Sequence, residues 1–157
     1  MARSIPPAIP SVAELLGKDY NENLQVAFPD VVPPYYPCGL LILVQLRRPK
    51  KLLKLGNGKT LILPDESADN EKFRTQTCLV RAMGPAAFKR RDTLEPWPEG
   101  AWCQVGDFIR GPMYGGDRVA VPIPGGSGDD EVILMAIKDL DVLGVIPGDP
   151  LAIKTLL

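Results

Sequence analysis

The sequence predicts an all-β protein, a small and partly open β-barrel of one domain with irregular arms at both ends. The chain of 157 residues contains 17 prolines and 15 glycines, which divide it into pieces too short for long helices. Its longest apolar runs, residues 40–44 and 132–137, have the length of strands. In the stretch 103–121, glycine and proline pairs separate two apolar segments, which is typical of a barrel hairpin.

Residues 1–36 are predicted to form a proline-rich N-terminal arm. Ser11 and Glu14 have the spacing of a capping box, and Gly17 follows the next two leucines, so one short helix is expected here. The rest of the arm should be extended, because a residue before proline disfavours helical geometry. Residues 31–37 are apolar enough to need a surface, either on the same barrel or on a neighbouring one. The alternative is a ligand for a proline-recognising domain.

The barrel is assigned to residues 37–146. Its first strand, 37–46, is apolar almost without interruption, which predicts burial on both faces. A second strand ends at the turn of Gly84 and Pro85. This second strand is 75–83, and the remaining barrel strands are expected at Phe108 and Ile109, at 118–121 and at 131–135.

Residues 47–75 form a long insertion in this barrel, with a basic cluster, a Gly-Asn-Gly turn and a polar end. Loops of this length inside a compact domain are usually functional or disordered. The insertion contains one isolated apolar triplet, Leu61, Ile62 and Leu63. The triplet is either a partner-binding element or an edge strand paired across Asn57 and Gly58 with the leucines at 52, 53 and 55.

Two further segments contain apolar side chains outside the strands. Residues 85–102 contain two tryptophans, of which Trp102 is predicted to lie in the core. Trp97 lies between two prolines and is predicted to contact another subunit or a partner. In the C-terminal tail, residues 147–157, Asp149 and Pro150 suit the start of a short helix that docks on a neighbour.

The sequence gives little support for catalysis, so we expect no enzyme, no catalytic residue, no cofactor and no metal site. The chain has no histidine, which excludes Ser-His-Asp and Cys-His machinery. The three cysteines, Cys38, Cys78 and Cys103, lack metal-ligand spacing and indicate reduced thiols. Lys59 and Thr60 resemble the end of a phosphate-binding loop, but Leu53 occupies the place of its required first glycine.

The charge and the apolar runs indicate where the chain works. A net charge of −1 predicts no nucleic-acid partner and no attraction to an anionic membrane. No apolar run is long enough to span a bilayer, and the first residues lack the apolar core of a signal peptide. We therefore expect a soluble cytoplasmic protein.

Two blocks of the sequence, in the right order, resemble GroES-type co-chaperonins. The first is the turn Val105-Gly106-Asp107 with the short strand after it and then Tyr114-Gly115. The second comprises residues 130–135 and 139–146. The resemblance covers residues 37–146 and suggests a divergent, phage-like member of the family. The first strand departs from the family, because it has two leucines, at 40 and 41, where Asp-Arg is usual.

The resemblance implies a ring, sevenfold in the family, that caps a GroEL-type chaperonin and encloses a folding client while the chaperonin hydrolyses ATP. The insertion 47–75 matches the family's mobile loop, and its triplet, Leu61, Ile62 and Leu63, matches the tripeptide that docks on the chaperonin. Residues 85–102 match the roof hairpin. Leu143, Val145 and Ile146, in the closing segment, are the expected oligomer contacts. The alternative is a structural assembly protein of a virion, such as a capsid or neck component, that uses the same barrel.

Overall fold

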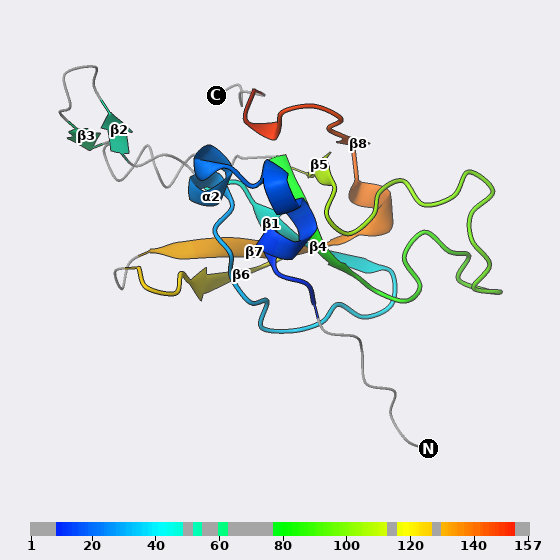
Figure 1. Ribbon diagram of the computed structural model, residues 1–157. Helices are drawn as coiled ribbons and strands as arrows, with labels where there is room; N and C mark the ends of the chain where they lie inside the picture. The colour runs from blue at the N-terminus through cyan, green and yellow to red at the C-terminus, as the bar shows by residue number, and fades with distance from the viewer. Residues whose placement is uncertain are drawn as a thin grey trace.

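The computed structural model describes residues 9–48, 77–112, 116–126 and 130–152, together with the backbone of two short strands, 52–54 and 60–62. This part of the chain is mostly sheet with a few short helices (Figure 1), which confirms the all-β prediction at this level. Its centre is a six-stranded antiparallel sheet in the order β6-β7-β1-β4-β5-β8. The strands are β1 (Leu41–Leu46), β4 (Thr77–Met83), β5 (Phe108–Arg110), β6 (Asp117–Pro122), β7 (Glu131–Lys138) and β8 (Gly144–Val145).

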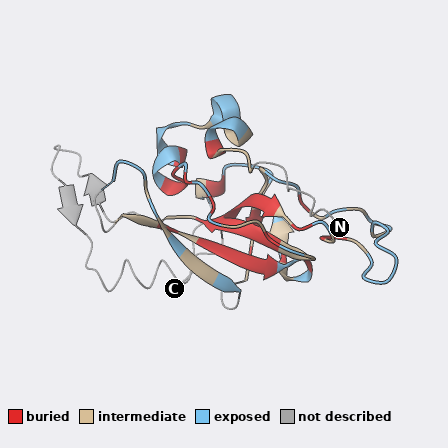
Figure 2. Cartoon of the chain, turned by 90° about the horizontal axis from the view of Figure 1, so that it is seen from below, coloured by how far each residue is buried: buried red, intermediate tan, exposed pale blue. Residues whose placement is uncertain are grey.

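Both faces of the central strands are buried, as the apolar run in the first strand predicts. Along β1, Ile42 and Val44 belong to one apolar cluster, while Leu43 between them belongs to another. On β7, Met135 and Leu134 divide between the same two clusters. Figure 2 shows this sheet as the largest continuous buried region of the chain. Side chains alternate across a sheet, so such a run needs a cover on each side.

The N-terminal arm covers one face and contains two α-helices. The first, α1 (Val12–Leu16), begins where expected, because the Ser11 side chain accepts a hydrogen bond from the Glu14 N–H at 3.1 Å. A 3₁₀ turn, η1 (Gly17–Asp19), leads to α2 (Glu22–Ala27), which is capped by Asn21. The prediction that the rest of the arm is extended was wrong over α2. No proline stands between residues 11 and 28, so the restriction on residues before proline does not apply to α2, and packing of its apolar side stabilises this helix.

The arm packs on the sheet of its own chain. Val12, Leu24 and Phe28 form a buried cluster with Leu79 of β4. The Phe28 ring lies 5.1 Å, centroid to centroid, from that of Phe108. Of the two surfaces predicted for the arm, the described residues therefore use the chain's own sheet.

A bulge in β4 joins the arm to the sheet through Arg81. The pairing of β1 with β4 passes from Leu43–Ala82 to Val44–Val80, which leaves Arg81 without a strand partner. Bulges re-aim side chains in this way. The Arg81 guanidinium is buried and donates to the backbone oxygens of Val31 and Pro10 at 3.0 and 3.1 Å, and to Gln45 Oε1 at 2.7 Å. Burial lowers the pKa of Arg81 and the nearby charge of Asp30 opposes that change.

The other face of the sheet is covered by residues 84–107, the green excursion on the right of Figure 1. Phe88 and Cys103 are buried in the cluster that includes Ile42 and Met135, and Val142 reaches the same cluster from beyond β7. The predicted roof hairpin is reduced to a single bridge between Lys89 and Pro96. The covering layer is therefore held mainly by its aromatic side chains.

The hairpin predicted within 103–121 is wrong, because β5 pairs with β4 and β8 while β6 pairs with β7. Three strands separate β5 from β6 in the sheet, which is about 19 Å on a flat sheet. Yet a Cβ at Gly111 would lie 3.8 Å from Met135 Cε, and one at Gly116 would lie 2.7 Å from Met135 Cγ. Both ends of the link thus approach one side chain, so the sheet is strongly curled. The glycines therefore predict that the chain reverses direction, but they do not predict which strand each segment pairs with.

After β7, the chain returns to the arm. A 3₁₀ turn, η2 (Asp139–Asp141), precedes β8, and another, η3 (Pro150–Ala152), follows it. Asp149 accepts a hydrogen bond from the Leu151 N–H at 3.0 Å, as expected for an N-cap. Leu151 packs against the buried cluster of the arm, so this turn docks on its own chain, and the neighbour contact expected for the tail stays a prediction. In the described part of the chain, no helix has the length and apolar character needed to cross a membrane.

Candidate partner-binding surfaces

The segment from η2 to β8 exposes three large apolar side chains at one edge of the sheet. Leu140 is 67% exposed, Leu143 is 65% exposed and Val145 is 43% exposed. We call these three side chains the β8 surface. β8 is the last strand of the described sheet on this side, and its inner edge is paired with β5 through the Ile146 N–H, which donates to the Phe108 oxygen at 2.8 Å. The structure therefore exposes two of the three predicted oligomer contacts and leaves Ile146 half-buried.

The predicted partner-binding triplet falls in and beside a separate two-stranded sheet. β2 (Leu52–Lys54) pairs with β3 (Thr60–Ile62), with Leu52 opposite Ile62 and Leu53 opposite Leu61. This is the pairing expected in the edge-strand alternative, but it forms a sheet of its own and does not extend the six-stranded sheet. Only the backbone of these strands is described, and Leu63 lies outside the described residues, as do Leu55, Asn57 and Gly58.

Trp97 belongs to an aromatic cluster on the excursion. Its ring lies 5.4 Å from that of Phe88 and 5.1 Å from that of Trp102, in edge-to-face arrangements. Both tryptophans are half-buried and pack on the core of the sheet. Trp102 therefore contacts the core as expected. The partner contact predicted for Trp97 stays a prediction, and only part of its ring remains accessible for one.

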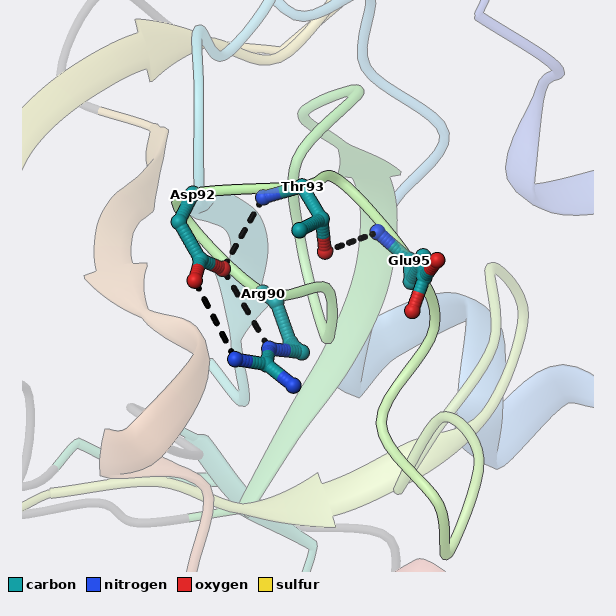
Figure 3. A network of polar contacts seen from close by, with 4 residues as sticks. All are labelled: Arg90, Asp92, Thr93 and Glu95. Carbon is teal, nitrogen blue, oxygen red and sulfur yellow. Dashed lines mark hydrogen bonds and ion pairs between the residues drawn. The ribbon is translucent and has the colours of Figure 1, made fainter.

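A short loop, residues 89–96, extends from this cluster and is held by polar contacts (Figure 3). The Arg90 guanidinium makes two hydrogen bonds to the Asp92 carboxylate, at 3.1 and 3.2 Å. Asp92 also accepts from the Thr93 N–H, and Thr93 Oγ1 accepts from the Glu95 N–H. In the backbone, the Leu94 N–H donates to the Arg90 oxygen at 2.9 Å. The tip of the loop, residues 90–95, is thus ordered by its own side chains.

Two residues of the excursion have left-handed backbone, although neither is glycine. The φ angles are 58° at Phe88 and 59° at Leu94. This conformation costs a non-glycine residue about 1–2 kcal/mol. At Phe88 the cost is offset, because the ring is buried and its N–H donates to the buried Asp139 carboxylate at 3.0 Å. Leu94 is 58% exposed and gains no such burial.

The thiols of the described core are unreactive at neutral pH. Burial raises the pKa of Cys78 to about 12 and that of Cys103 to about 11. Nucleophilic and metal-binding chemistry needs the thiolate, so these two side chains serve as apolar core residues. Within the described residues, Cys, Asp and Glu side chains do not gather in threes as metal ligands would.

Sequence reasoning missed three features of the structure, two on these surfaces and one in the core. Leu140 stands in the block that resembles the family's closing segment, but its exposure depends on the 3₁₀ turn at η2. The φ of Leu94 depends on how the loop closes, and the residue types in the loop do not predict it. Arg81 lies in a predicted strand, where a buried cation is the exception, and only the bulge explains its position.

No protein-family model and no curated protein sequence matches the chain. The candidate surfaces are therefore defined by the chain's own residues, their exposure and their contacts.

Proposed function

We propose that the chain is a co-chaperonin-like ring subunit, similar to the GroES type, that caps an ATP-driven chaperonin and assists protein folding. The observation that carries the proposal is the place of the β2–β3 hairpin. It lies in the connection between β1 and β4, which are neighbouring strands of the central sheet. The sheet is complete without this hairpin, so the insertion is free to serve a partner. A binding element on a detachable lid has this position in the resembling family.

The energetics suit a lid that binds and releases. Burying the three aliphatic side chains Leu61, Ile62 and Leu63 would contribute about 5–9 kcal/mol. Each loop residue that becomes ordered on binding costs about 1–2 kcal/mol, so about four such residues would offset most of this gain. One insertion would therefore bind weakly. Several insertions on one ring make the later contacts intramolecular, and this avidity supplies factors of about 10²–10⁴.

The curled sheet and its exposed edge support the ring. A curled six-stranded sheet is the form that a partly open barrel would take, and the β8 surface supplies apolar contacts beside that barrel's free edge. We propose a homo-oligomer, a heptamer as in the family, with Leu143, Val145 and Ile146 at the subunit contact and Trp97 near a roof or partner contact. The lid itself would perform no chemistry and would act in the cytoplasm.

The test is binding of the purified protein to a chaperonin double ring, with and without ATP, read by sedimentation and negative-stain imaging. We expect nucleotide-dependent caps on the chaperonin. Replacing Leu61, Ile62 and Leu63 together with serine should abolish capping and leave the ring's mass unchanged. The matched control replaces Val26 and Val32, which are exposed apolar residues of the arm, with serine. If the triple variant still caps the chaperonin, the insertion is not the element that binds it.

A second candidate is a structural assembly protein, such as a virion component, and one observation favours it. Leu61 and Ile62 lie in a paired strand, which suits a permanent contact more than a loop that docks and detaches. On this proposal the protein would not bind the chaperonin, either with or without ATP. It would instead form a stable array or join a larger particle, which the same sedimentation experiment would detect.

A further inference from the structure

We propose that Leu94 of one copy of the chain packs on the β8 surface of a second copy and so joins neighbouring subunits. The inference rests on the ring in the proposed function and names the contact that would build it. It does not depend on what the ring binds. Leu94 acts as a small apolar projection, and Leu140, Leu143 and Val145 act as its receiving surface.

The first argument is the conformation of Leu94. Its φ of 59° is one that glycine or asparagine adopts with much less strain, and its side chain is largely exposed. A leucine at this position is therefore unfavourable twice within its own chain. Asparagine or glycine at this position would avoid both the backbone strain and the exposed apolar surface. We therefore infer that the leucine side chain makes its contact outside its own chain. The Arg90–Asp92 contacts beside it hold the loop in one conformation, which lowers the ordering cost of an association.

The second argument is complementarity between the loop and the β8 surface. Both are apolar at their centres, and the charges around them are of opposite net sign. Segment 89–95 contains three basic and two acidic residues, whereas the residues of segment 138–149 that are not buried include one basic and two acidic residues. Charges arranged in this way steer two surfaces together and fix their orientation. These basic and acidic residues are Lys89, Arg90, Arg91, Asp92 and Glu95 in the first segment, and Lys138, Asp141 and Asp149 in the second.

The third argument is that the chain does not make this contact with itself. The Phe88 N–H donates to Asp139, which anchors the base of the loop beside the start of η2. Leu94 and Leu140 nevertheless remain 58% and 67% exposed, so they do not cover each other. A second copy offers both surfaces at once. A contact between two different patches of the same chain is heterologous, and repetition of it closes a ring when the rotation per subunit allows.

The opposite edge of the sheet is a poor competitor for the β8 surface. β6 carries Asp117, Arg118 and, at its end, Pro122, which has no N–H to donate. Charged residues and proline are features that discourage pairing at a sheet edge. Among the described residues, large exposed apolar side chains gather instead at η2 and β8.

The first test compares the wild-type chain with Leu94→Asn by light scattering and sedimentation over a range of concentrations. Asparagine fits the left-handed backbone, so the variant should melt at the same or a higher temperature while its assembly weakens at least about tenfold. A loss of assembly together with retained or improved thermal stability separates a contact residue from a folding residue. The control, Val32→Asn, removes a valine that is 81% exposed and should leave assembly unchanged.

The outcomes separate this inference from the proposed function. If Leu94→Asn assembles over the same concentration range as the wild-type chain, the inference is overturned and the proposed ring is unaffected. A wild-type chain that is monomeric at every concentration would overturn both the inference and the ring. An assembled wild-type chain that fails to cap a chaperonin would overturn the lid and leave the contact intact.

The second test is site-directed cross-linking in a Cys38→Ser background, where the remaining described cysteines are buried. Chains that carry Leu94→Cys are mixed with chains that carry Leu143→Cys, and glutathione disulfide is added as the oxidant. We expect a disulfide-linked pair from the mixture, and a ladder of higher species from a chain with both substitutions. Chains with Val32→Cys should not pair with the Leu143→Cys chain. No cross-link to Leu143→Cys would overturn the inference, and a double variant that stops at dimers would contradict a heterologous contact.

Discussion

Replacing Arg81 with methionine would test how the arm is held on the sheet. The substitution keeps a long unbranched side chain in the buried space but removes every donor. Arg81 donates to the oxygens of Val31 and Pro10 in the arm and to Gln45 in β1. Gln45 in turn donates through Nε2 to the Pro29 oxygen at 2.8 Å. The arm, β1 and β4 are thus joined by one buried polar network.

The magnitude follows from two opposing contributions. A hydrogen bond from a charged donor contributes about 1.5–3 kcal/mol, and a buried acceptor left without a partner costs about 1–3 kcal/mol. Against this, the wild-type chain carries the desolvation cost of the buried guanidinium, which lowers the pKa of Arg81 and which methionine avoids. With three bonds lost and this cost relieved, we expect a net loss of about 2–4 kcal/mol in unfolding free energy. For a chain of this size the melting temperature should fall by about 4–16 °C.

The assay is thermal and urea unfolding followed by circular dichroism, with hydrogen exchange to locate the change. The arm amides in α1 and α2 should exchange faster, while those of β7 keep most of their protection. The control is Arg90→Met, because Arg90 is exposed and its pair with Asp92 should contribute less than about 1 kcal/mol. Equal melting temperatures for Arg81→Met and Arg90→Met would refute the role given to the buried network.

Two further predictions concern the core. Gly84→Ala should lower unfolding free energy by roughly 2–4 kcal/mol in urea titrations, because its Cβ would fall on the carbonyl oxygen of Gly39, whereas Gly148→Ala has open space and should be nearly neutral; equal stability of the two variants would contradict the close approach. Above pH 9 the unfolding free energy should fall as pH rises, because Cys78 ionises near 9 when unfolded but only near 12 when folded, so the folded state keeps a proton that the unfolded state loses. The slope for this thiol approaches about 1.4 kcal/mol per pH unit, and Cys78→Ala should reduce the total slope by about that amount between pH 10 and 11; an unchanged slope would argue against burial of the thiol.

Local signals in the sequence predicted those elements that local chemistry determines. The Ser11 cap and the stop at Gly17 fix α1 with contacts inside seven residues, so pattern alone locates it. The unbroken apolar run of β1 likewise predicts two covered faces. By contrast, α2 is short and is stabilised by packing of Leu24 on the sheet, which a local pattern does not contain. The partner of β5 depends on the whole sheet, so glycines at a reversal do not reveal it.

The candidate surfaces show the same division. The resemblance locates Leu143 and Val145 in the closing segment, and the structure exposes both side chains. Leu94 escapes prediction because its backbone angle arises from loop closure and from the contacts of Arg90 and Asp92. Exposure of an apolar residue is common and uninformative in itself, whereas exposure together with an unfavourable φ is not.

The position of the arm limits how this chain can assemble. An arm that covered a neighbour would leave one face of its own sheet open, but here Val12 and Phe28 cover that face, and the aromatic cluster around Phe88 covers the other. With both faces filled from within the chain, contact between copies is left to sheet edges and loops. Removing residues 1–36 would therefore uncover Leu79 and Leu43 and test folding before it tested assembly. A direct test of assembly has to leave the arm in place and change the β8 surface or Leu94, where the loss of a contact does not open the core.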